Sequence, residues 1–228
     1  MKLARISLLF LLFTLISNLG GIMEIHGSEF FLLPEPSKKG RISLEESIFL
    51  RKSVREFSDQ PLTLEELSQI LWASQGKVKS GRRSAPSAGA LYPLEIYVVS
   101  GNIETINPGI YRYDFKRHGL SKILEGDRRS SLASAALGQY WVKNAAVDVI
   151  LTAIFERTTA KYGERGVRYV FIEAGHVAQN ILLQAVSLGL GAVPVGAFYD
   201  EEVRKTLNLP QEEKPVYIIP IGREKQRP

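Results

Sequence analysis

Residues 51–57 read Arg-Lys-Ser-Val-Arg-Glu-Phe, and this string decides how the rest of the 228-residue chain is interpreted. Three cations surround one hydroxyl residue, directly after a segment with the capping pattern of a short helix. A doubly charged phosphate needs several donors at once, and guanidinium and ammonium groups supply them. The alternative is a solvated basic helix end, which the helix dipole also favours. The string therefore predicts a phosphate clamp, provided that other segments complete a site.

Two later segments combine small side chains with kinks. Residues 84–93 read Ser-Ala-Pro-Ser-Ala-Gly-Ala-Leu-Tyr-Pro, and residues 189–198 read Gly-Leu-Gly-Ala-Val-Pro-Val-Gly-Ala-Phe. Small residues let the backbone approach a ligand closely, as a flat ring system requires. The alternative for the first segment is an ordinary turn before a strand, and the alternative for the second is a buried strand after a helix end. Together with the clamp, the two segments predict a site for a large planar cofactor that carries a phosphate.

Composition narrows the function classes. Hydrophobic residues make up 45% of the chain, which predicts one globular domain with a sizeable core. The net charge of +5 suits an anionic cofactor, but the basic residues are scattered among acids, so we expect no nucleic-acid partner. The chain has no cysteine, which excludes disulfides, thiolate nucleophiles and iron–sulfur clusters. Its three histidines lack metal-ligand spacing, so no metal site is expected. No G-x-G-x-x-G follows an expected strand, so a Rossmann dinucleotide site is not supported.

The N-terminus has the character of a signal. Lys2 and Arg5 precede an apolar run over residues 6–16, which suits a secretory signal and is short for a membrane span. An over-extended start is the alternative, because Met23 opens a segment that reads as a native beginning. We thus expect either an exported or anchored protein, with membrane contact only through residues 1–22 if they are retained, or a cytoplasmic protein starting near Met23. Residues 23–42 read as a leader or linker, and residues 43–228 as one domain.

Local patterns predict mixed helices and strands without a strict strand–helix–strand repeat, which favours an α+β domain. Capping-box spacing opens two helices at Ser43 and Thr63. Pro220 suggests that the last strand lies at least partly near a sheet edge. The expected helices cover residues 43–52, 63–75, 128–137, 165–188 and 200–207, and the expected strands cover residues 95–100, 110–115, 120–124, 147–155 and 216–221.

Taken in order, these segments resemble the FMN-dependent nitroreductase family over about residues 43–224. The resemblance implies a nitroreductase-like α+β fold, with a mainly antiparallel central sheet flanked by helices, and a homodimer. It also implies FMN as the cofactor. In that family the first string reaches the FMN phosphate, ribityl chain and pyrimidine edge, and a basic residue after the last strand meets the phosphate again. These roles fall on Arg51, Lys52, Ser53, Arg55, Gly222 and Arg223.

The same resemblance assigns the two small-residue segments to the flavin ring. The first loop comes from the partner subunit in that family and lies along the isoalloxazine, a role that falls on Pro86, Ser87, Ala88, Gly89 and Leu91. The second offers backbone N–H groups to flavin N5 and O4, a role that falls on Pro194, Val195 and Gly196. An N–H donor at N5 stabilises negative charge on reduced flavin.

Residues 158–169, Thr-Thr-Ala-Lys-Tyr-Gly-Glu-Arg-Gly-Val-Arg-Tyr, are similar to the SagB-type branch, which includes thiazole- and oxazole-forming dehydrogenases. There a Lys-Tyr pair serves proton removal during azoline oxidation, which makes Lys161 and Tyr162 the catalytic candidates. The resemblance implies an FMN-dependent oxidoreductase that transfers hydride through flavin N5 and acts as a nitroreductase or dehydrogenase on a small organic molecule, with NAD(P)H or another small donor. The alternatives are an azoline dehydrogenase of peptide modification and a non-catalytic flavin-binding or exported binding protein.

Overall fold

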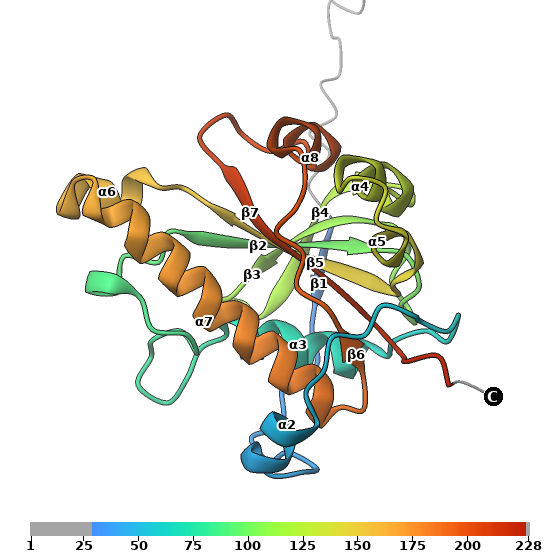
Figure 1. The fold of residues 1–228 in the computed structure, drawn as a ribbon. Helices are drawn as coiled ribbons and strands as arrows, with labels where there is room; N and C mark the ends of the chain where they lie inside the picture. The colour runs from blue at the N-terminus through green and yellow to red at the C-terminus, as the bar shows by residue number, and fades with distance from the viewer. Residues whose placement is uncertain (1–28, 227–228) are drawn as a thin grey trace, which may run out of the picture.

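A computed structural model describes residues 29–226 and arranges them around one seven-stranded sheet (Figure 1). Every neighbouring pair of strands in it is antiparallel, which confirms the α+β class and the mainly antiparallel sheet. The expected signal or anchor over residues 1–22 lies outside the described residues. Across the sheet the strands are β1 (Phe30–Leu32), β4 (Gly119–Glu125), β3 (Gly109–Asp114), β2 (Leu94–Ser100), β5 (Val147–Ala153), β7 (Lys214–Gly222) and β6 (Gly191–Ala192).

Helices cover both faces of the sheet, so the central strands are buried on both sides. Ile96 and Val98 of β2 belong to a core with α3 (Leu64–Gln75) and α7 (Arg165–Ser187). Tyr97 and Val99 belong to a second core on the opposite face, because successive strand residues point to opposite sides. The remaining helices are α2 (Leu44–Leu50), α4 (Arg129–Ala135), α5 (Tyr140–Asn144), α6 (Glu156–Tyr162), α8 (Asp200–Leu207) and the 3₁₀ turn Ala88–Ala90. None of the helices between residues 29 and 226 is long and apolar enough to cross a membrane.

Several expected boundaries are confirmed by hydrogen bonds at helix ends. Thr63 and Glu66 form the complete capping box of α3, with bonds of 2.9 and 3.2 Å. The Ser43 side chain caps α2 by accepting from the Glu46 amide at 3.0 Å. Asp127 does not occupy the capping position of α4, although its carboxylate accepts from the second amide after it.

Four elements were not predicted. Residues 30–32 of the expected leader form β1 and pair with β4, so part of segment 23–42 belongs to the sheet. α6 occupies residues that we expected to form a turn between β5 and α7, and α5 and β6 were also missed.

The expectation that the last strand lies at least partly near a sheet edge is confirmed. β7 is next to the edge strand β6, and residues 191–195 run along only part of it, so its first residues pair with β5 alone. Pro220 itself lies in the part that has neighbours on both sides. Pro220 is tolerated there because proline lacks only the N–H, and its carbonyl accepts from the Val193 amide at 3.2 Å.

The fold carries one buried carboxyl with an unusual environment. Asp148 lies in the middle of the sheet, and neither of its oxygens has a hydrogen-bond partner among the described residues. Burial raises the pKa of this carboxyl well above its usual range, although Arg129 opposes the shift. The folded protein therefore holds this proton more tightly than the unfolded chain does.

Replacing Asp148 should change how stability depends on pH. A raised folded-state pKa gives stability that is fully present below the unfolded pKa of about 3.9 and is lost as pH rises toward the folded value. Asp148→Asn cannot titrate, so urea unfolding between pH 4 and 8 should show a smaller loss of stability with rising pH. Asp127→Asn is the control, because its hydrogen bond with Arg129 lowers the pKa of Asp127 and its contribution has the opposite sign. Equal pH profiles for wild type and Asp148→Asn would contradict the assignment.

Candidate functional site

Three segments that are distant in sequence meet at the C-terminal end of α7. The Val54 amide donates to the Ala192 carbonyl at 3.0 Å, which joins the basic string to β6. The Ser58 amide donates to the Arg223 carbonyl at 2.9 Å, which joins the same string to the chain after β7. The structure thus brings together the two basic segments that the sequence assigned to one phosphate.

A cavity of about 1120 Å³ lies between these segments. Arg51 sits just outside it, at the end of α2, where its amide donates to the Ser47 carbonyl. Cations outnumber carboxylates in the lining, so the cavity suits an anion. Its cationic and hydroxyl side chains are Lys52, Ser53, Arg55, Arg223 and Lys225.

Two of these cations are already paired with carboxylates. Arg223 Nη2 lies 3.0 Å from both oxygens of Glu66, the residue that also completes the cap of α3. This partly buried pair fixes the direction of the Arg223 side chain. Lys52 Nζ lies 2.7 Å from Glu224, and that pair is exposed and contributes little to stability. Arg55 stacks over the Trp141 ring at 5.5 Å and remains turned to the cavity.

The loop over residues 86–92 lies against the Lys-Tyr pair. Gly89 has φ +60, and a β-carbon there would lie 2.8 Å from the Tyr162 hydroxyl and 3.1 Å from Lys161 Nζ. A side chain at this position would displace the ends of both side chains, and the positive φ also favours glycine. The structure therefore joins two candidate groups that the sequence treated separately.

Buried polar side chains of the core form hydrogen bonds beside this loop. Gln75 donates to Glu173 at 3.3 Å, and Arg83 donates to the Gln75 side-chain oxygen. Ser87 accepts from the Tyr92 amide at 2.8 Å. Burial raises the pKa of Glu173, while a hydrogen bond with Ser87 opposes the shift. Sequence analysis assigned no role to these side chains; the one signal that could have found them is a carboxylate, Glu173, on the apolar face of α7.

The turn over Pro194, Val195 and Gly196 has fewer free donors than expected. Proline has no N–H, and the Val195 amide donates to the Ile218 carbonyl at 2.8 Å within the sheet. The Gly196 amide forms no hydrogen bond to another residue in the described part of the chain, and Gly196 is exposed. Of the three residues, only Gly196 thus has a backbone amide that is available to a ligand, and its expected role at flavin N5 stays a prediction.

The clamp and the loop lie at opposite ends of α7 (Figure 1). α7 has 23 residues, and a rise of 1.5 Å per residue makes it about 34 Å long. The clamp adjoins Gly189 just after its end, whereas the loop adjoins Lys161 and Tyr162 just before its start. The cationic donors of the clamp suit a phosphate, and within one chain the loop is separated from them by about the length of α7.

A family model, a relative and a solved structure that match this chain are all described as nitroreductases. The family model described as "Nitroreductase family" matches residues 48–223. The protein MJ1384 of Methanocaldococcus jannaschii, a candidate nitroreductase, is 48% identical over 184 residues, which cover 80% of this chain and 92% of that protein. A nitroreductase-type structure from Ralstonia eutropha superposes with a TM-score of 0.76 at 33% identity, over 87% of this chain and 90% of that one.

Two further relatives differ in their named roles. The microcin B17-processing protein McbC of Escherichia coli is 32% identical over 137 residues, which cover 58% of this chain and 50% of McbC. The FMN reductase [NAD(P)H] of Bacillus subtilis is 25% identical over 190 residues, which cover 77% of this chain and 64% of that enzyme. The chain thus spans about half of the peptide-processing relative.

Proposed function

The chain belongs to the nitroreductase family, and from that premise we propose that two copies form an oxidoreductase whose two flavin sites each take residues from both copies. An FMN-dependent oxidoreductase is the activity that the family and the flavin-reducing relatives support. The observation that carries the proposal is the separation of the clamp and the loop by the length of α7. A second copy can close that gap, whereas a bend in one chain cannot.

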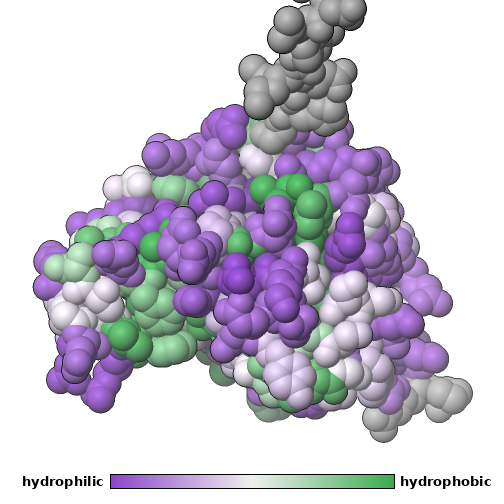
Figure 2. Space-filling view, turned by 90° about the horizontal axis from the view of Figure 1, so that it is seen from above, coloured by the Kyte–Doolittle hydropathy of each residue, from purple (hydrophilic) through white to green (hydrophobic). Residues whose placement is uncertain are grey.

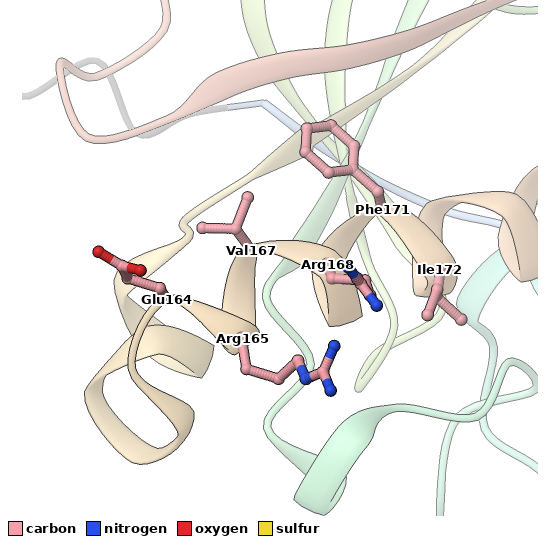
Figure 3. A pocket seen from close by; sticks show the side chains of 6 residues that line it. All are labelled: Glu164, Arg165, Val167, Arg168, Phe171 and Ile172. Atoms are coloured by element: carbon pink, nitrogen blue, oxygen red, sulfur yellow. The ribbon is translucent and has the colours of Figure 1, made fainter.

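The exposed face of α7 supports such a pairing. Figure 3 shows Val167, Phe171 and Ile172 projecting from this helix beside charged side chains. Phe171 is 53% exposed, and Phe49 on the neighbouring α2 is 86% exposed. Figure 2 shows hydrophobic surface on the left, the side on which α6 and the first turns of α7 lie in Figure 1. Large apolar side chains gathered on one face are typical of a protein interface.

Gly175 marks where two helices could cross. It lies near the middle of α7, is exposed, and a β-carbon there would have no neighbour within 4 Å. Glycine costs roughly 1 kcal/mol inside a helix relative to alanine, and close approach of a second helix would offset this cost. A two-fold axis at this position sets the start of one α7 beside the end of the other. Each loop over residues 86–92 then meets the clamp of its partner.

In this arrangement each group has a separate task. Arg51, Arg55 and Arg223 bind the phosphate, and the Gly196 amide donates at the ring edge. FMN, when bound, supplies the two-electron chemistry. Lys161, stacked at 5.4 Å on the Tyr162 ring, is placed to take the proton that a C–H bond loses in an oxidation. The substrates that fit are small organic molecules, with NAD(P)H or another small donor.

One observation favours a second candidate, the dehydrogenation of azoline rings in modified peptides. The contact of Lys161 and Tyr162 with Gly89 gives a candidate base a fixed place at the loop. McbC, to which this chain is similar, is named for processing microcin B17. Turnover with a thiazoline peptide would support the azoline dehydrogenase, whereas turnover with NAD(P)H and a nitroarene would support the small-molecule oxidoreductase.

Arg51→Ala and Arg55→Ala should each weaken FMN binding. Loss of one charge-assisted hydrogen bond costs roughly 1.5–3 kcal/mol, or about ten- to a hundredfold in affinity. Fluorescence titration of flavin-free protein measures this change. Arg41→Ala removes an exposed arginine outside the cavity and should bind FMN as the wild type does. Unchanged affinity in both clamp variants would remove the clamp from the site.

Lys161→Ala should retain FMN while turnover falls, by about a hundred- to ten-thousandfold if the residue acts as a base. Mixing this variant with Arg55→Ala tests the shared site. A mixed dimer has one site with both defects and one with neither, so unfolding and refolding together should restore about a quarter of wild-type turnover. Each variant refolded alone is the control. No restoration, with mixed dimers shown by mass spectrometry, would mean that each site lies within one chain.

Gly175→Leu should prevent dimer formation without harming the single chain. Leucine has the higher helix propensity, and the position has free space within its own chain. Light scattering should give the 25.4 kDa mass of one chain rather than twice that value, and flavin content should fall. Ser134→Leu adds the same side chain on exposed α4 and should remain dimeric. A flavin-loaded dimer of Gly175→Leu would exclude this helix as the interface.

A further inference from the structure

A second cavity, of about 410 Å³, lies where β2 begins and β3 ends, beside α6. It shares no lining residue with the clamp cavity. Four cationic side chains line it, against the two carboxylates Glu95 and Asp114. The cations are Arg83, Arg112, Lys116 and Arg157.

Glu95 is shared between two arginines. Its two oxygens lie 2.7 Å from Arg157 Nη1 and 2.9 Å from Arg112 Nη2. One carboxylate therefore faces two guanidinium groups, each of which has five N–H donors. The group of three carries a net positive charge and more donors than Glu95 can accept. Glu213 also acts on the charge of Arg112, but it does not line the cavity and its carboxylate is directed to the Thr152 hydroxyl at 2.9 Å.

Arg83 adds a third guanidinium to the cavity. Among residues 29–226, no carboxylate lies within ion-pair distance of it. It stacks on the Phe115 ring at 3.9 Å and donates to the Leu94 carbonyl at 3.3 Å, so its contacts are neutral. Asp114 does not offset it, because Arg117 Nε lies 2.7 Å from that carboxylate and backbone amides donate to it. The cavity thus has surplus positive charge in a partly desolvated place, which favours an anion.

We propose that this cavity binds a compact oxyanion, a carboxylate or phosphate group of a small molecule, with Arg112 and Arg157 as its principal donors. Planar guanidinium groups match both oxyanions in geometry, whereas a lysine offers only a point charge. Lys116, on the turn after β3, completes the positive rim.

The cavity is connected to the loop over residues 86–92. Arg157 Nη1 donates to the Tyr92 carbonyl at 3.2 Å, and Arg83 stacks on the Tyr92 ring at 4.7 Å. Arg157 and Lys161 are one turn apart on α6, and residues four apart lie on the same helix face. An anion that draws Arg157 toward the cavity weakens its hydrogen bond to the Tyr92 carbonyl. On the proposed function, anion binding would therefore shift the loop that faces the flavin.

The test uses the FMN-loaded protein, so that the clamp is already filled. Sodium phosphate and sodium malonate are titrated separately by calorimetry, against sodium chloride at equal ionic strength. We expect saturable binding of at least one oxyanion beyond the chloride baseline. Binding of phosphate alone or of malonate alone identifies the preferred class.

Arg112→Gln should reduce that affinity about ten- to a hundredfold, because one charge-assisted contact is lost. Its side chain is 41% exposed, and Glu95 keeps Arg157, so the fold should survive. Lys116→Gln should reduce the affinity less, and Arg117→Gln, which does not line the cavity, should not change it. No binding of either oxyanion beyond chloride, or equal binding by wild type and Arg112→Gln, would overturn the proposal. Either result leaves the clamp and its FMN untouched.

Discussion

The site depends on one constraint: residues 51–58 are packed tightly between β6 and the end of β7. Backbone hydrogen bonds hold the string on both sides, and the approach is close because two glycines face it. A β-carbon on Gly191 would lie 2.6 Å from Val54, and one on Gly222 would lie 2.9 Å from Phe57. Gly222, which the family resemblance places at the phosphate, therefore also serves packing. The cations converge because apolar neighbours on the same string are buried against these glycines.

The length of α7 is the second constraint. A rigid helix of this size holds the clamp at one end and the loop at the other, so neither can be moved to the other by a small rearrangement. The chain instead leaves one face of that helix apolar and exposed. In the proposed pair, this face forms the interface and the two sites are completed. The proposal therefore links association to cofactor binding, because ligand bound at an interface stabilises the assembly.

How much the sequence predicts depends on how local each signal is. The helix starts at Ser43 and Thr63, the neighbouring strands near residues 110–124 and α8 follow from nearby residues, and the structure has them within a few residues of the expected bounds. β1 was missed because three residues become a strand only when β4 lies beside them. In the candidate site the basic string and the Gly89 loop were visible as motifs. The pairing of Arg223 with Glu66 was not, since 157 positions separate the partners.

The loop over residues 86–92 is held both by its own hydrogen bonds and by the core. The amides of Ala90 and Tyr92 donate to Ser87, and Glu173 and Arg83 reach the loop from α7 and the preceding turn. Burying such groups is costly unless they bond to each other, and here each finds a partner in Gln75. These bonds hold the loop in one conformation within the single chain. A surface presented in one conformation loses little entropy on binding, which suits the role that we propose for this loop at the flavin of a second copy.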